Sequence, residues 1–168
     1  MALSKIQAES MNLADLSDKF PRELKVSYMR LLSFGNKNSI SGEISTAFCG
    51  DDNSIIKEAL SEDGKNKILV IDANGVTHES IVGDEIASMA IENNWQGIVL
   101  NGFIRDADEI NKLNIKILAK GEVFKKTKKN NIGRRDILIS FGGLIFKPGY
   151  WLYADKITWG ISRKKLEL

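Results

Sequence analysis

Residues 83–110 read GDEIASMAIENNWQGIVLNGFIRDADEI, and this stretch decides the fold class. In residues 83–93 apolar side chains recur at helical spacing, which predicts an amphipathic helix. The predicted buried face of this helix is formed by Ile86, Met89 and Ala90. Residues 97–100, GIVL, are an apolar run typical of a buried strand, and residues 106–113 predict a short helix. The stretch therefore indicates a strand between two helices.

The chain before and after this stretch repeats the alternation. Strands are predicted at residues 40–48, 67–72, 97–100 and 115–119. Between the first two, Asp51, Asp52 and Asn53 are capping residues in front of an apolar face, so a helix is expected to begin there. A further helix is predicted over residues 9–20, before Pro21. Alternating strands and helices predict a parallel sheet with crossover helices.

After residue 120 the pattern changes to short strands separated by turn residues. These strands are predicted at residues 136–140, 143–147, 150–154 and 157–161. The sequence therefore predicts an α/β fold with an α/β first half and a barrel-like β second half. No linker separates the halves, so residues 1–168 are expected to form a single domain.

Composition narrows the class of protein. The chain has 168 residues, of which 43% are hydrophobic and 27% are charged, as is ordinary for a soluble globular protein. Its net charge of +2 is too small to indicate a nucleic-acid partner. The N-terminal sequence MALSKIQAES contains no long apolar stretch, so neither a signal peptide nor a membrane anchor is expected. We expect a cytoplasmic protein without a membrane partner.

The chain contains one cysteine, Cys49, and one histidine, His78. A single cysteine excludes an internal disulfide bond. No motif pairs these two residues, which argues against a zinc site or a Cys/His nucleophile. We therefore expect Cys49 to be a small core residue at the end of a strand.

Gly83 and the start of the helix that follows it form the first candidate site. A glycine lets the backbone approach a ligand closely, and the N–H groups of Asp84, Glu85 and Ile86 would point out of the helix start. Such a helix end can bind a carboxylate or a phosphate. The alternative is an ordinary helix N-cap provided by Asp84.

Arg105 and Asp106 form the second candidate site, because they follow a predicted strand. In open α/β sheets ligands gather at the carboxyl ends of the strands. Arg105 could bind a carboxylate through two parallel hydrogen bonds, and Asp106 could hold a hard divalent cation. Together they would suit a 2-oxo acid, but the pair could also be a helix cap with a salt bridge. Glu109, one helical turn later, could serve the site or face water.

Residues 120–135, KGEVFKKTKKNNIGRR, are strongly basic. A basic run can bind RNA or an acidic partner, but it is more often a solvated, mobile loop. Phe124 is the one aromatic residue in it that could stack on bases, so the sequence argues against nucleic-acid binding.

Several of these stretches, in order, resemble the family of the regulator of ribonuclease E activity A, whose relatives include class II 4-hydroxy-4-methyl-2-oxoglutarate aldolases. The similar stretches are AFCGDDNSIIKEALSEDGKNKILVID, GDEIASMAIENNWQGIVLNGFIRDADEI, LNIKILAKG and ISFGGLIFKPGYWLYAD. The resemblance extends from about residue 10 to about residue 162. It implies a swivelling β/β/α domain that assembles as a homotrimer or a dimer of trimers, with sites between subunits.

The resemblance also implies roles for the candidate site. The aldolase branch carries an Asp, twenty residues and then Arg-Asp, which match Asp84, residues 85–104 and Arg105-Asp106. It implies that Asp106 binds Mg²⁺ or Mn²⁺ directly and Asp84 binds it through a water. Arg105 is implied to hold the pyruvyl group, with help from the backbone of residues 84–86.

The function that the resemblance implies is a metal-dependent carbon–carbon lyase. It would cleave 4-hydroxy-4-methyl-2-oxoglutarate-type 2-oxo acids to pyruvate through a metal-stabilised enolate, with oxaloacetate decarboxylase side activity. The alternative is a non-catalytic inhibitor that binds ribonuclease E. The inhibitor branch is expected to lack the metal-binding Asp, so Asp106 favours the enzyme. A menaquinone methyltransferase, an older assignment of the family, is not supported, because no glycine-rich nucleotide loop follows the first strands.

Overall fold

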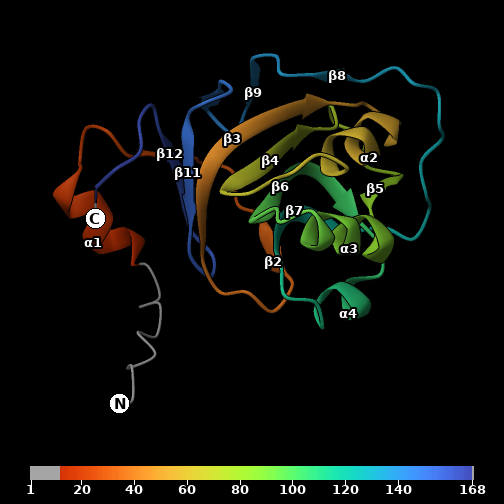
Figure 1. Ribbon diagram of the computed structural model, residues 1–168, viewed down its shortest axis with the longest axis horizontal. Coiled ribbons are helices and arrows are strands. Elements are labelled where there is room, and N and C mark those ends of the chain that lie inside the picture. Colours follow the sequence, from red (N-terminus) through yellow and green to blue (C-terminus); the bar gives the residue numbers. More distant parts are fainter. Residues whose placement is uncertain (1–11, 168) are drawn as a thin grey trace.

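The computed structural model describes residues 12–167, and a ten-stranded sheet forms its centre (Figure 1). The helices are α1 (Leu13–Lys19), α2 (Ser54–Leu60), α3 (Asp84–Glu92) and α4 (Ala107–Ile110). The first strands are β1 (Lys25–Val26), β2 (Leu32–Phe34), β3 (Ile40–Phe48), β4 (Lys67–Asp72), β5 (Ser80–Val82) and β6 (Gly97–Ile104). The later strands are β7 (Lys116–Glu122), β8 (Arg134–Arg135), β9 (Ile139–Phe141), β10 (Leu144–Phe146), β11 (Trp151–Ala154) and β12 (Trp159–Ser162).

The centre of the sheet is parallel, as the alternation of strands and helices predicted. Strands β3, β4, β6 and β7 lie side by side in this order, each parallel to the next. Both faces of these strands are buried, which explains their nearly continuous apolar sequences. In β4, Leu69 and Ile71 belong to the core that also contains α2 and α3 residues, whereas Ile68 and Val70 belong to the core on the other face.

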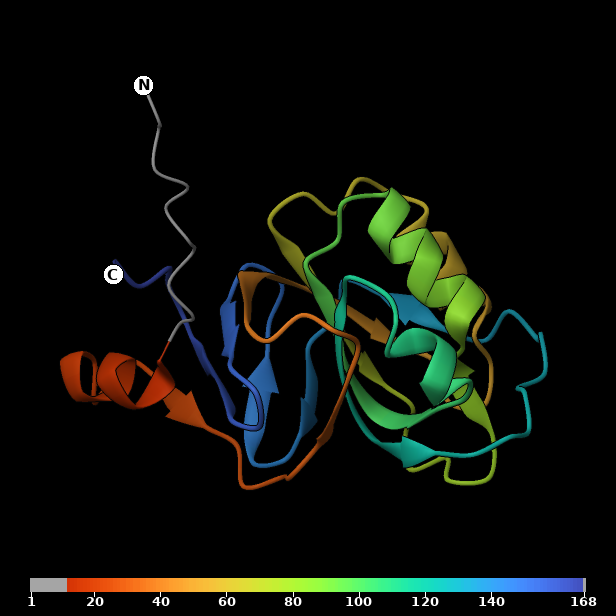
Figure 2. The same cartoon turned by 90° about the horizontal axis from the view of Figure 1, so that it is seen from below.

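The second half of the chain is antiparallel. Strand β11 pairs with both β3 and β12, so this half extends the same sheet, and β9 and β10 form a separate two-stranded sheet. Residues from β9 to β12 bury their apolar side chains in the second core. Figure 2 shows these blue strands gathered on the side of the molecule away from α3. The predicted mixed α/β fold class is therefore confirmed.

Several boundaries differ from the prediction. The short strands β1, β2, β5 and β8 were not predicted, since two or three residues give no readable periodicity. Strand β6 continues to Ile104 rather than ending at residue 100, because β5 pairs with its last residues. Helix α4 spans four residues rather than 106–113. Helix α1 begins after its N-cap Asn12. Residues 9–11 of the predicted helix lie outside the described residues.

Cys49 directly follows β3 and is fully buried, as predicted. Burial, followed by the charges of Asp72, Asp52 and Asp51, raises the pKa of the Cys49 thiol to about 12. The thiol is therefore protonated at neutral pH and is a packing group rather than a nucleophile. None of the helices within residues 12–167 has the length and apolar character needed to cross a membrane.

Candidate active site

The two candidate motifs lie next to each other at one edge of the sheet. Strand β5 ends before Gly83 and strand β6 ends before Arg105, and the two strands are parallel, with Val82 opposite Ile104. The Arg105 N–H donates to the Val82 carbonyl over 3.0 Å, which fixes the two strand ends together. The backbone therefore brings together motifs that are about twenty residues apart in the sequence.

Gly83 makes room for the Arg105-Asp106 pair. A Cβ atom at position 83 would lie 3.2 Å from Asp106 Oδ2 and 3.5 Å from both Cγ and Nε of Arg105. The backbone of Gly83 has a φ of −115°, which other residues also adopt. Space beside the two charged side chains, rather than backbone conformation, is therefore what favours a glycine here.

Asp84 is not the N-cap of α3, so the capping alternative is wrong. The N-cap is Gly83, and within residues 12–167 no side chain caps this helix. The first backbone bond of the helix runs from the Ala87 N–H to the Gly83 carbonyl over 3.0 Å. In the same range, the N–H groups of Asp84, Glu85 and Ile86 have no hydrogen-bond partner. The helix start therefore presents unpaired donors, as anion sites do.

Asp106 occupies the N-cap position of α4, but its carboxylate does not cap the helix within the described chain. Instead, Glu122 Oε2 accepts the Ala107 N–H over 2.8 Å. Asp106 Oδ2 lies 3.7 Å from Arg105 Nε, and the two side chains are 42% and 39% exposed, so this ion pair contributes little to stability. Asp106 also has the left-handed φ of 60°, a strained conformation that is common at functional sites.

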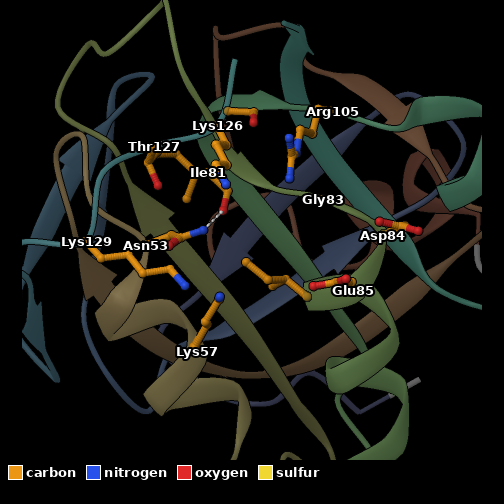
Figure 3. Close-up of a pocket in the computed structure, with 12 residues that line it drawn as sticks. Asn53, Lys57, Ile81, Gly83, Asp84, Glu85, Arg105, Lys126, Thr127 and Lys129 are labelled. Carbon is orange, nitrogen blue, oxygen red and sulfur yellow. Dashed lines mark hydrogen bonds between the residues drawn. The ribbon is translucent and has the colours of Figure 1, made fainter. Parts of the chain in front are cut away.

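Five of the six predicted site residues line one pocket of about 420 Å³ (Figure 3). They are Gly83, Asp84, Glu85, Ile86 and Arg105. Asp106 lies outside this lining, in a neighbouring hollow that Arg105 shares. Glu109 also lines that hollow, but it pairs with Lys112 over 3.2 Å and is 60% exposed, so it faces water.

The opposite wall of the pocket was missed by the sequence analysis. It consists of Asn53, Lys57, Lys126, Thr127 and Lys129, together with Ser80 and Ile81 of β5. The basic loop was interpreted as a solvated, mobile segment, and Lys126 and Lys129 are indeed exposed. The loop nevertheless returns over the sheet edge and forms part of the pocket. The charge composition of residues 120–135 does not indicate that the loop folds back over the edge of the sheet.

Two anchors hold the segment 125–132, here called the basic strap. At one end, the N–H and hydroxyl of Ser80 donate to the Lys125 carbonyl over 2.7 and 3.1 Å. At the other end, Oδ2 of the buried Asp52 accepts the Ile132 N–H over 3.0 Å. The N–H and hydroxyl of Ser54 occupy the other carboxylate oxygen of Asp52, over 2.9 and 2.8 Å.

The charge of Asp52 is stabilised by these donors. Burial alone would raise the pKa of its carboxyl, but hydrogen bonds from Ser54, Ile132 and Asn130 outweigh burial and lower it. Asp52 therefore stays ionised at neutral pH and remains a strong acceptor for the strap backbone.

The lysines of the pocket lie close to one another. The pKa of Lys57 is lowered, chiefly by its contact with the Lys129 ammonium and next by burial, while the charge of Glu85 partly opposes the shift. Among the residues that the structure describes, Lys57, Lys126 and Lys129 form no ion pair with a carboxylate. This end of the pocket therefore carries positive charge that the protein does not neutralise.

Comparison with known proteins identifies the family. Residues 12–157 match the sequence profile of the RraA-like family, described as Aldolase/RraA. The chain belongs to the RraA-like family. A protein of Pseudomonas aeruginosa (strain LESB58) is 40% identical over 154 residues, covering 92% of this chain and 95% of its own length. A protein of Dechloromonas aromatica is 39% identical over 156 residues, covering 90% and 96%. Both are provisionally named 4-hydroxy-4-methyl-2-oxoglutarate aldolase.

Solved structures agree with this membership. The RNA-processing inhibitor RraA from Thermus thermophilis superimposes with a TM-score of 0.87 at 28% identity, covering 94% of this chain and 95% of its own. A protein of Geobacillus kaustophilus, described as an S-adenosylmethionine:2-dimethylmenaquinone methyltransferase, gives a TM-score of 0.90 at 36% identity, covering 93% and 97%. The fold of this chain therefore occurs in solved structures with two different descriptions, an RNA-processing inhibitor and a methyltransferase.

The acidic residues of this RraA-like site fit a loosely held hard cation better than a closed metal centre. No cluster of three or more His, Cys, Asp or Glu residues that could hold a metal occurs within residues 12–167. The Asp106 carboxylate is accessible and is not used for capping, so its oxygens are available. One carboxylate completed by waters suits Mg²⁺ or Mn²⁺, whereas a structural zinc site needs four protein ligands.

Proposed function

We propose that this RraA-like protein is a divalent-metal-dependent lyase that releases pyruvate from 4-hydroxy-4-methyl-2-oxoglutarate-type 2-oxo acids. Oxaloacetate decarboxylation is proposed as its side activity. The observation that carries this proposal is the sheet edge itself, where a guanidinium, unpaired helix N–H groups and two carboxylates free of capping meet. The names of relatives at about 40% identity support the same reaction class.

Arg105 and the start of α3 would bind the 2-oxo acid end of the substrate. The guanidinium can donate two parallel hydrogen bonds to oxygen atoms of the pyruvyl group. The N–H groups of residues 84–86 provide further donors on the same pocket wall. The N–H groups are held by the start of α3 before the substrate arrives, so little free energy is lost in orienting them.

Asp106 would hold Mg²⁺ or Mn²⁺ directly, and Asp84 would hold it through a water. When bound, such a cation polarises the keto oxygen and stabilises negative charge that develops on it. Arg105 lies beside Asp106 and can stabilise the same charge as it forms. Asp84 would accept or donate the proton that the reaction moves.

The proposed cleavage is a retro-aldol reaction. The hydroxyl on C4 loses its proton, the bond between C3 and C4 breaks, and its electron pair passes to the enolate of pyruvate. A proton then returns to C3, which gives pyruvate and a second carbonyl compound. In oxaloacetate the same C3–C4 bond breaks, but carbon dioxide is the leaving fragment.

A pyruvate-release assay tests this function. The purified protein is offered 4-hydroxy-4-methyl-2-oxoglutarate and oxaloacetate, with magnesium and with EDTA. We expect release that depends on magnesium. If neither substrate yields pyruvate, or if EDTA leaves the rate unchanged, the proposal is wrong.

We also propose that the protein assembles as a homotrimer or a dimer of trimers, as the resemblance to the regulator family implies. Light scattering across micromolar concentrations should give the mass of three or six chains. A monomer throughout this range would contradict the assembly.

A second candidate is a protein that binds and inhibits ribonuclease E, because RraA from Thermus thermophilis has the same fold and is described as an RNA-processing inhibitor. Such a protein needs neither a metal nor Arg105. Inhibition of the ribonuclease that survives Arg105→Ala, together with no lyase activity on 2-oxo acids, would favour this candidate.

A further inference from the structure

Glu122 is an acidic residue beside the site that the proposed chemistry does not use. It is the last residue of β7 and lies opposite Ile104, the last residue of β6, in the parallel pairing of these strands. The Val123 N–H donates to the Ile104 carbonyl over 2.9 Å, which fixes this strand end. Glu122 and Asp106 line the same hollow. The sheet therefore places the Glu122 side chain in the hollow that contains the proposed metal ligand.

The contact of Glu122 with helix α4 is made at the residue that follows Asp106. The Oε2 atom of Glu122 accepts the Ala107 N–H over 2.8 Å, and a carboxylate is a strong acceptor for such a group. Within residues 12–167, no other side chain accepts an N–H from the first turn of α4. Helix α4 has only four residues, so it has little stability of its own. Glu122 is therefore the side chain that fixes the start of this helix.

Asp106 has a backbone conformation that its neighbours must maintain. Its φ of 60° and ψ of 41° are left-handed, which costs free energy for a residue with a side chain. On one side, the Arg105 N–H donates to the Val82 carbonyl over 3.0 Å. On the other side, Glu122 holds the Ala107 N–H. Asp106 therefore lies between two anchored residues, and loss of either anchor would let its backbone relax.

The relaxed conformation of Asp106 would be an ordinary helix cap. N-cap residues usually have an extended backbone, and the carboxylate of an N-cap Asp then accepts the N–H groups of the second and third helical residues. These residues are Asp108 and Glu109, whose N–H groups have no partner within the described part of the chain. An Asp106 carboxylate that accepted these N–H groups would be less available to a cation.

We infer that Glu122 is a positioning residue for Asp106. By accepting the Ala107 N–H, it keeps the Asp106 carboxylate off the helix and free to bind a divalent cation. This inference rests on the proposed function, in which Asp106 holds the cation, and it requires the hydrogen bond of Glu122 rather than its charge. Direct binding of the cation by Glu122 would require the charge instead. No group of three or more His, Cys, Asp or Glu residues within the described chain is arranged to hold a metal, which favours the positioning role.

Two conservative variants separate the hydrogen bond from the charge. Glu122→Gln keeps an acceptor oxygen at the end of a side chain of the same length but removes the charge. Glu122→Asp keeps the charge, but its side chain is shorter by a methylene group and no longer reaches the Ala107 N–H from the end of β7. Glu109→Gln is the matched control, because Glu109 lines the same hollow but pairs with Lys112. Positions 109 and 122 are exposed, so these variants should keep the fold, which a thermal melt checks.

Electron paramagnetic resonance of Mn²⁺ measures the metal affinity of the protein without substrate. We expect Glu122→Asp to weaken Mn²⁺ binding at least about tenfold, the usual consequence of losing a group that orients a metal ligand. Glu122→Gln and Glu109→Gln should bind Mn²⁺ as wild type does. Asp106→Asn should remove the binding, since otherwise Mn²⁺ lies elsewhere and the inference fails. Unchanged binding in Glu122→Asp, or a loss in Glu122→Gln that equals or exceeds the loss in Glu122→Asp, would overturn the positioning role.

Pyruvate release separates failure of this inference from failure of the lyase. In an active enzyme, a higher magnesium concentration should restore release by Glu122→Asp, because the cation competes with the helix for the Asp106 carboxylate. If Mn²⁺ binding follows the expected pattern but neither 2-oxo acid yields pyruvate, the positioning role stands and the lyase is wrong. If wild type releases pyruvate with magnesium but Glu122→Asp and Glu122→Gln bind Mn²⁺ equally, the positioning role is wrong and the lyase remains.

Discussion

The two walls of the pocket are built in different ways. The wall formed by Gly83 and Arg105, here called the sheet wall, is fixed by pairing of β5 with β6. Its residues therefore lie where the hydrogen-bonded sheet places them. The lysine wall combines Lys57 of helix α2 with the basic strap, a loop held at two points, Ser80 and Asp52. The difference suggests a division of labour in which the sheet wall orients the reacting atoms and the strap selects what enters.

The largest effect is expected from Asp106→Asn, in the hollow next to the sheet wall. The amide cannot hold a divalent cation as a carboxylate does, so metal-dependent pyruvate release should be abolished. The fold should survive, because Asn tolerates the left-handed backbone of Asp106 and Glu122 provides the helix cap. Pyruvate release and a thermal melt check both parts. A variant that keeps its rate would show that Asp106 is not a metal ligand.

Arg105→Ala should be the next largest effect. Losing one donor that meets developing charge typically costs about 3 kcal/mol, or on the order of a hundredfold in rate. Arg105→Lys should recover little of this loss, since an ammonium cannot form two parallel hydrogen bonds to one group. Steady-state kinetics and inhibition by oxalate, an enolate mimic, are the measurements. Unchanged oxalate affinity in Arg105→Ala would place Arg105 away from the reacting centre.

Gly83→Ala should have an intermediate effect. The new Cβ would lie 3.2 Å from Asp106 Oδ2 and would displace both charged side chains slightly. We expect roughly a tenfold loss of kcat/KM, because small misplacement of reacting groups is costly. The melting temperature should hardly change, since the backbone at this position is not left-handed. A stable variant with full activity would show that the crowding at this wall is unimportant.

Asp52→Asn should have the smallest effect on the chemical step and act mainly on the strap. It leaves buried donors poorly satisfied, which we expect to lower the free energy of unfolding by about 1–3 kcal/mol. Substrate KM should rise more than kcat falls, because the lysines lose their positions while the sheet wall stays intact. An equal fall in kcat would contradict the division of labour between the walls.

The acid dependence of stability provides a control on the same residue. The pKa of Asp52 is lowered by folding, so its contribution is fully present above the ordinary value of 3.8 and is lost as the pH falls through the lower folded value. Wild type should therefore lose stability in this acid range, and Asp52→Asn should lose less. Urea unfolding at pH 7 and below pH 4 measures the difference.

The sequence predicted the sheet wall because its signals are local. Arg105 follows a predicted apolar strand and Gly83 directly precedes a predicted amphipathic helix, so each motif was marked by its immediate neighbours in the sequence. The sequence could not decide whether Asp84 and Asp106 were caps. That answer depended on Gly83 and Glu122, and Glu122 lies sixteen residues beyond Asp106.

The lysine wall could not be predicted, because its position depends on long-range contacts. The buried carboxylate of Asp52 receives a backbone N–H from Ile132, eighty residues later. Neither residue type nor spacing distinguishes such an anchor from the ordinary helix cap that was expected of Asp51, Asp52 and Asn53. The short strand β5, which brings Ser80 to the strap, was likewise too short to be recognised.

The most direct test of the central claim is the exchange of the C3 protons of pyruvate for deuterium, followed by NMR in heavy water. This exchange requires formation of the pyruvate enolate at the sheet wall. The account predicts exchange that depends on magnesium, is lost in Arg105→Ala and persists in Lys128→Met, because Lys128 lies in the basic strap but does not line the pocket. Exchange that is absent from wild type with magnesium, or equal in wild type and Arg105→Ala, would contradict it.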